Sequence, residues 1–105
     1  VPPVDLVLTG DGYVATFDLP GVEPAAVKVT VEEGVLSVRG EKVAPETPEG
    51  AREARRERQF GEFSRTVPLP SDADATQTSA KLENGVLTVR IGRRGPVTQI
   101  EVPVQ

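Results

Sequence analysis

Two turns followed by nearly the same phrase constrain the fold of this chain more than any other feature. Gly34-Val35-Leu36-Ser37-Val38-Arg39 recurs as Gly85-Val86-Leu87-Thr88-Val89-Arg90, after Glu33 and Asn84. An Asn-Gly dipeptide strongly favours a hairpin, because a type I′ turn needs positive φ at both central residues. If Glu33-Gly34 and Asn84-Gly85 form the two loops, one face of each hairpin is apolar and the other polar. The sequence therefore predicts two β-hairpins that form the two halves of a sandwich core.

This register makes specific predictions about burial. It places Val31 opposite Leu36 and Leu82 opposite Leu87. The residues expected to be mostly buried are Val29, Val31, Leu36, Val38, Leu82, Leu87 and Val89. The repeated phrase is equally compatible with an internal duplication and with a common hairpin sequence.

The composition agrees with a β protein. The chain has 105 residues, with 17 valines, 10 glycines and 10 prolines, and β-branched residues with frequent turns are typical of short strands. Alternating Tyr13, Ala15, Phe17 and Leu19 predict a further strand. The apolar fraction is 37%, against a usual ~45–50%, so one domain with a modest core is expected.

Several classes of chemistry lack the residues that they need. The chain has no His, Cys, Met or Trp, which excludes histidine bases, cysteine nucleophiles and the common zinc or haem sites. Asp72-Ala73-Asp74 resembles the start of a calcium loop but lacks the central Gly and final Glu, so a capped turn is favoured. We therefore predict a protein that is not an enzyme and has neither cofactor nor metal.

The charge disfavours two kinds of partner. A net charge of −4 opposes binding to nucleic acid and to anionic membranes. Arg52, Arg55, Arg56 and Arg58 alternate with glutamates that cancel most of their field. The absence of cysteine is compatible with the cytoplasm, which is the expected location.

Two segments lie outside the hairpin pattern. Residues 41–59 are polar and rich in charge, and we interpret them as a long exposed loop with a strand that orders only on a partner. The expected division is a β-sandwich domain over residues 1–92 and a C-terminal extension over residues 93–105. The chain begins with Val1 rather than Met, which indicates a fragment or a processed chain that either a signal peptide or an N-terminal arm preceded.

Four phrases, in order along the chain, resemble those of a known family. They are Leu19-Pro20-Gly21, Glu57-Arg58-Gln59-Phe60-Gly61-Glu62-Phe63-Ser64-Arg65 with Leu69-Pro70, Ala80-Lys81-Leu82-Glu83-Asn84-Gly85-Val86-Leu87, and Ile100-Glu101-Val102. Together they resemble the α-crystallin domain of bacterial small heat shock proteins. Pro68 departs from the family pattern and would remove one backbone donor near a strand end.

The resemblance implies an antiparallel, immunoglobulin-like β-sandwich with ATP-independent holdase activity toward unfolding client proteins. It also implies a homodimer in which a loop strand within residues 51–59 pairs with the partner's strand Val4–Leu8, and larger homo-oligomers assembled through the tail. The implied dimer interface comprises Val4, Leu6, Leu8, Arg58, Phe60 and Arg65. The implied groove for clients and tail comprises Val27, Val29, Val31, Ala80 and Leu82, and the tail motif that enters it is Ile100 with Val102.

Two other hypotheses remain open. A co-chaperone of the p23-like type, or another β-sandwich interaction module, has the same shape but docks onto one larger chaperone. An extracellular adhesion module would be a monomer with a secretory signal in the complete gene.

Overall fold

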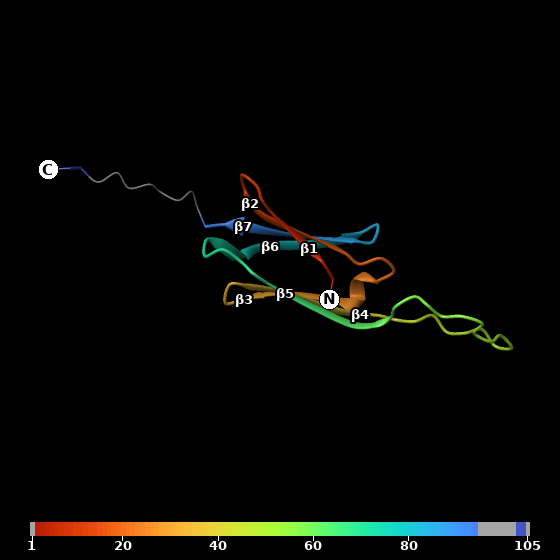
Figure 1. Ribbon diagram of the computed structural model, residues 1–105. Coiled ribbons are helices and arrows are strands. Elements are labelled where there is room, and N and C mark those ends of the chain that lie inside the picture. Colours follow the sequence, from red (N-terminus) through yellow and green to blue (C-terminus); the bar gives the residue numbers. More distant parts are fainter. Residues whose placement is uncertain (1, 95–102, 105) are drawn as a thin grey trace.

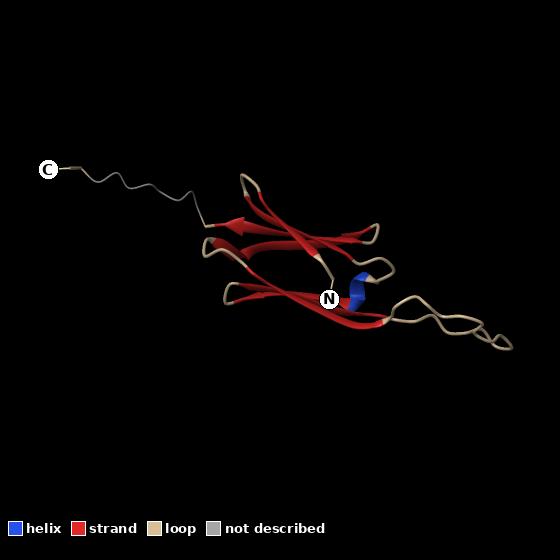
Figure 2. Ribbon diagram, viewed as in Figure 1, coloured by secondary structure: helices blue, strands red, loops and turns tan. Residues whose placement is uncertain are grey.

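The computed structural model describes residues 2–94, 103 and 104. In this part of the chain the elements, in order, are β1 (Val4–Leu8), β2 (Gly12–Asp18), the 3-10 turn η1 (Pro24–Ala26), β3 (Val27–Glu32), β4 (Val35–Lys42), β5 (Gly61–Pro68), β6 (Ala73–Glu83) and β7 (Val86–Arg93). The strands form two antiparallel sheets, in the orders β1-β2-β7-β6 and β3-β4-β5. Figure 2 shows these sheets as two stacked layers, which confirms the predicted antiparallel β-sandwich.

Both predicted hairpins have the predicted register. Val31 pairs with Leu36 across the β3–β4 hairpin, and Leu82 pairs with Leu87 across the β6–β7 hairpin. Glu33 and Asn84 have φ of 50° and 53°, and the glycines after them have φ of 75° and 76°. Positive φ at both positions is what a type I′ turn requires. Each hairpin contributes to a different sheet, so the two are halves of one sandwich.

The core lies between the sheets. Its buried members are Tyr13, Ala15, Phe17, Leu19, Leu36, Val38, Val67, Leu87, Val89 and Ile91. Val29, Val31 and Leu82, which were expected to be mostly buried, are partly buried and pack against this core. Their position explains the difference, because they belong to β3 and β6, the edge strands on one side of the two sheets.

The sheets have unequal widths, and the wider one overhangs. Strand β3 contacts β6, so the two sheets are aligned along this side. In the described residues β1-β2-β7-β6 has one strand more than β3-β4-β5. Strand β1, at the opposite edge, therefore extends beyond the narrower sheet.

Two element boundaries differ from those expected. Glu41 and Lys42 belong to β4, where they pair with Glu62 and Gly61, so the loop comprises residues 43–60 rather than 41–59. These loop residues form neither a strand nor a helix, and they extend away from the sandwich (Figure 1). Strand β7 continues to Arg93, one residue past the expected end of the domain.

Candidate functional site

A groove lies between the facing edges of the two sheets. Strands β3 and β6 border a cavity of about 270 Å³ lined by Val29, Val31, Ala75, Thr78, Ser79 and Ala80. The valines occupy alternate positions of β3, so their side chains share one face of the strand. The small side chain of Ala80 contributes to the hollow, and this residue is exposed.

The structure brings together three of the five residues predicted for the groove. Val29, Val31 and Ala80 line this cavity. Leu82 lies two residues farther along β6 and packs partly against the core. Val27, the first residue of β3, lines a different cavity near η1.

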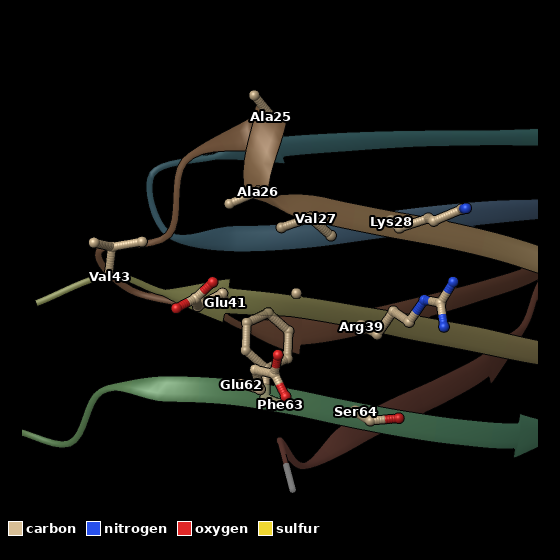
Figure 3. Close-up of a pocket in the computed structure, with 11 residues that line it drawn as sticks. Ala25, Ala26, Val27, Lys28, Arg39, Glu41, Val43, Glu62, Phe63 and Ser64 are labelled. Carbon is tan, nitrogen blue, oxygen red and sulfur yellow. The ribbon is translucent and has the colours of Figure 1, made fainter.

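That second cavity is larger but lacks the features of a reaction centre. It has a volume of about 680 Å³ and is lined by η1 and by residues of β3, β4 and β5 (Figure 3). Lys28, Arg39, Glu41 and Glu62 bring charges of both signs to it (Figure 3). All four are exposed, as expected for the solvated face of a sheet. Nowhere in the described residues do three or more His, Cys, Asp or Glu side chains lie together in a way that could hold a metal ion.

Strand β1 presents an uncovered apolar strip. Leu6 pairs with Ala15 and Leu8 pairs with Tyr13, so the leucines share a face with buried core residues. Nevertheless Leu6 is 38% exposed and Leu8 is 59% exposed. Val4, at the start of the strand, is partly buried against the core. The uncovered leucines follow from the overhang of β1 beyond the narrower sheet.

The end of the loop gathers cations around an aromatic ring. Lys42 Nζ, Arg56 Cζ and Arg58 Cζ lie 5.7, 5.5 and 5.0 Å from the centroid of the Phe60 ring. Contacts of this length fall in the range of cation–π interactions. Arg56 also forms an ion pair of 2.6 Å with Glu53. Phe60 thus anchors the base of a loop that is otherwise exposed.

Arg65 points toward the core side of its sheet. It pairs with the buried Val38 on the neighbouring strand, and directly opposed residues project from the same face. Its side chain is partly exposed at the edge strand β5. Among the described residues Arg65 takes part in none of the recorded ion pairs. An inward-facing charge on an edge strand discourages indiscriminate strand pairing.

Sequence reasoning missed a polar cluster beside the end of β7. The Tyr13 hydroxyl donates to Asp72 Oδ1, Arg93 Nε donates to Asp72 Oδ2 at 2.8 Å, and the Arg94 amide donates to the Asp72 carbonyl oxygen at 2.7 Å. The bonds from Tyr13 and then Arg93 lower the pKa of the Asp72 carboxyl, and the same bond to Asp72 raises the pKa of Tyr13. These residues are distant in sequence, so no local pattern revealed the cluster.

The turn expected after Pro70 is present, where the Ala73 amide donates to the Pro70 carbonyl oxygen at 3.0 Å. Asp74 lies beyond this turn, at the bulge of β6. The Thr76 hydroxyl donates to Asp74 Oδ1 at 2.6 Å, and the Thr76 amide donates to the same oxygen at 3.0 Å. These bonds lower the pKa of Asp74.

The tail residues Ile100 and Val102 lie outside the described residues.

Comparison with known proteins identifies the family. The model of the Hsp20/alpha crystallin family matches residues 5–105. This chain belongs to that family. The Arabidopsis thaliana 22.0 kDa heat shock protein is 42% identical over 94 residues, which cover 89% of this chain and 48% of the relative. The Streptomyces albus G 18 kDa heat shock protein is 40% identical over 89 residues, covering 85% of this chain and 62% of the relative. The chain thus spans about half to three-fifths of the length of these relatives.

Solved small heat shock proteins share the fold. The hspA of Xanthomonas axonopodis is 40% identical with a TM-score of 0.76, over 89% of this chain and 93% of that chain. A Xylella fastidiosa small heat-shock protein described as having a distinct high order structure is 34% identical, with a TM-score of 0.81 over 100% and 96% of the two chains. Members of the family are non-enzymatic chaperones that form oligomers and bind clients. In the described part of this Hsp20-family chain, no helix has the length and apolar character to cross a membrane.

Proposed function

We propose that this chain is an ATP-independent holdase that binds extended apolar segments of unfolding proteins in the β3–β6 groove. The single observation that carries the proposal is the groove itself, with Val29 and Val31 on one sheet edge and Ala80 on the other. A strand edge is a template for another extended chain, and alternate side-chain pockets give such binding its specificity. Unfolding proteins expose segments of this kind.

The contact is weak when it occurs singly. Full burial of an Ile or Val contributes ~1.5–3 kcal/mol, whereas ordering the backbone costs ~1–2 kcal/mol per residue. A segment that buries two such side chains therefore binds reversibly. Affinity becomes high only when several grooves act on linked segments. Reversible contacts allow a holdase to release its clients.

The tail of this protein competes for the same groove. Ile100 and Val102 are two residues apart, which puts both on one side of an extended segment. Arg93 ends β7 and the Arg94 amide is bonded to Asp72. The six residues from Arg94 to Ile100 can span roughly 20 Å at ~3.3 Å per residue, so the motif can enter a groove that lies within this distance. Tail binding would link homodimers into larger homo-oligomers and would limit access of clients.

The dimer uses the opposite side of the sandwich. Strand β1 has an unpaired edge, and Leu6 and Leu8 lie uncovered beside it. We propose that residues 51–59 of a second copy pair with this edge, with Arg58, Phe60 and Arg65 at the interface. We also propose that the protein is cytoplasmic and binds neither nucleic acid nor membranes.

The test compares how well a groove variant, a matched control variant and the parent suppress the aggregation of a client. Ala80→Asp places a charge in the groove at an exposed position, and Thr30→Asp adds the same charge on the exposed outer face of β3. We expect the parent and Thr30→Asp to suppress heat-induced aggregation of a model client without ATP, and Ala80→Asp to lose most of this effect. Equal suppression by both variants would place client binding elsewhere. One stoichiometric chaperone partner with no suppression by any variant would favour the p23-like alternative.

A further inference from the structure

Like charges lie opposite one another on the outer face of the β3-β4-β5 sheet. Lys28 on β3 pairs with Arg39 on β4, and Glu41 on β4 pairs with Glu62 on β5. All four residues are exposed, and none of them takes part in an ion pair recorded among the described residues. Like charges that are directly opposed across a sheet lower its stability. The isolated domain therefore gains no stability from this arrangement.

The four charges are sorted by sign along the strands. Arg39 and Glu41 are two residues apart on β4, so the basic pair occupies one outward-facing row of the sheet and the acidic pair the next. All four line the cavity of about 680 Å³, where Figure 3 shows Lys28 and Arg39 at one end and Glu41 and Glu62 toward the other. The outer face of this sheet thus carries a positive patch beside a negative patch.

A second copy of this face is complementary to it. A two-fold axis that lies parallel to the sheet and perpendicular to its strands turns the face over and reverses the direction of the strands. The basic row of each copy then meets the acidic row of the other, which gives two equivalent sets of opposite charges. A partner with charges of only one sign would be repelled by one of the two rows. The pattern therefore favours a second copy over a uniformly acidic or basic partner.

We propose that two copies of this chain associate face to face through the outer surfaces of their β3-β4-β5 sheets, with Lys28 and Arg39 of each copy facing Glu41 and Glu62 of the other. This contact uses neither the β3–β6 groove nor the uncovered edge of β1, so it is independent of the proposed client binding, tail docking and loop exchange. Ala25 and Val43 add exposed apolar surface to the same cavity lining. Because exposed ion pairs contribute little individually, the contact is weak and is populated only at high protein concentration.

The test measures self-association by sedimentation equilibrium at low ionic strength, where the screening of charges is weak. All samples carry Ile100→Gly and Val102→Gly, so that the tail motif does not link molecules. Arg39→Glu leaves one basic and three acidic residues among the four positions, and Glu41→Arg leaves one acidic and three basic residues. Each substitution changes two symmetric contacts, so we expect each variant alone to weaken the association about tenfold, which corresponds to ~1.4 kcal/mol.

Arg90→Glu is the matched control for charge reversal. Arg90 is exposed and lies between the buried Val89 and Ile91, so it projects from the outer face of the other sheet. This variant changes the net charge by the same amount as Arg39→Glu does. It should associate within about twofold of the parent, because the proposed contact does not include that face. Equal weakening by Arg90→Glu and Arg39→Glu would assign the effect to net charge and would contradict the proposal.

A mixture of the two interface variants gives the decisive result. The acidic face of Arg39→Glu is complementary to the basic face of Glu41→Arg, so an equimolar mixture should associate at least as tightly as the parent although neither variant does so alone. Failure of the mixture to restore association would overturn the proposal. Association of either single variant at the strength of the parent would overturn it as well, and so would a parent without any association step that Arg39→Glu weakens.

Thermal unfolding at low protein concentration separates recognition from structural damage. Arg39→Glu places an acidic residue opposite Lys28, and Glu41→Arg places a basic residue opposite Glu62, so each variant replaces a like-charge pair by an opposite-charge pair. Each variant should therefore unfold at the midpoint of the parent or above it, even though its association is weaker. A lowered midpoint together with weaker association would assign the loss to damage of the sheet and would contradict the proposal. A loop-exchanged dimer would be a separate association step, present in all variants or in none.

Discussion

At the scale of single residues, Asp72 connects three parts of the fold. It accepts hydrogen bonds from Tyr13 of β2 and Arg93 of β7, and its carbonyl oxygen accepts from the amide of Arg94. The turn before β6 is thereby fixed to the last described residues before the tail. Asp72 therefore holds Arg93 and Arg94 beside the turn that precedes β6.

Asp72→Asn should change how stability depends on pH. The bonds from Tyr13 and Arg93 lower the pKa of the folded carboxyl below its unfolded value of about 3.9. Their contribution is complete above the unfolded pKa and is lost as pH falls through the folded pKa. The free-energy difference between wild type and Asp72→Asn should thus be constant near neutral pH and shrink below about pH 4.

Urea unfolding between pH 7 and pH 2 measures this difference. Asp11→Asn, in the exposed turn between β1 and β2, is the matched control for loss of a carboxylate. A difference for Asp72→Asn that stays the same at every pH would show that the hydrogen bonds of Asp72 do not stabilise its charged form.

Leu87→Ala should be strongly destabilising. Leu87 is 2% exposed and pairs with Phe17 on the neighbouring strand, so truncation leaves a cavity in the core. The expected loss is ~2–5 kcal/mol in the free energy of unfolding, measured with denaturant. Val43→Ala, at a position that is 69% exposed in the loop, should change it by less than ~0.5 kcal/mol. Similar losses for both variants would contradict the assigned core.

At the scale of elements, the loop between β4 and β5 is the segment that we propose to pair with a second copy of the chain. Lys42 pairs with Gly61 at its base, so the two strands already meet in hairpin register before the loop begins. Residues 43–60 are therefore not needed to bring β4 and β5 together. Their length instead supports the proposal that they exchange with a second copy.

Replacing residues 43–60 by Asn-Gly should give a folded monomer. A two-residue turn of this type suits the hairpin ends at Lys42 and Gly61. Sedimentation equilibrium measures the mass, with the tail motif disabled in all samples. A Gly/Ser loop of the original length is the control and should also be monomeric if the loop side chains make the interface. A dimer of unchanged affinity after the replacement would rule out exchange.

The hairpins were predictable because their determinants are local. A turn dipeptide and an alternating pattern fix register over a few residues, as at Asn84-Gly85 and between Leu82 and Leu87. The partial burial of Val29 was not predictable, since it depends on which strand lies at a sheet edge. The Tyr13–Asp72 hydrogen bond could not be predicted from the sequence either, because 59 residues separate its partners. The groove residues could be predicted only by combining the alternating apolar pattern with the family resemblance.

At the scale of the whole molecule, the sandwich has two different open sides. On one side, β3 and β6 border the groove that holds Thr78 and its apolar neighbours. On the other, β1 overhangs with exposed Leu6 and Leu8. Because the two sides are separate, the proposed dimer and the proposed tail docking are compatible with each other.

We propose that the β3–β6 groove holds either the tail or a client, one at a time. Its most direct test is light scattering of the chain with Ile100→Gly and Val102→Gly, combined with binding of an unfolding substrate. We expect assemblies to shrink toward folded dimers while substrate binding persists or rises, because the groove becomes free. Assemblies of unchanged size would contradict tail docking, and loss of substrate binding by folded dimers would contradict competition for one groove.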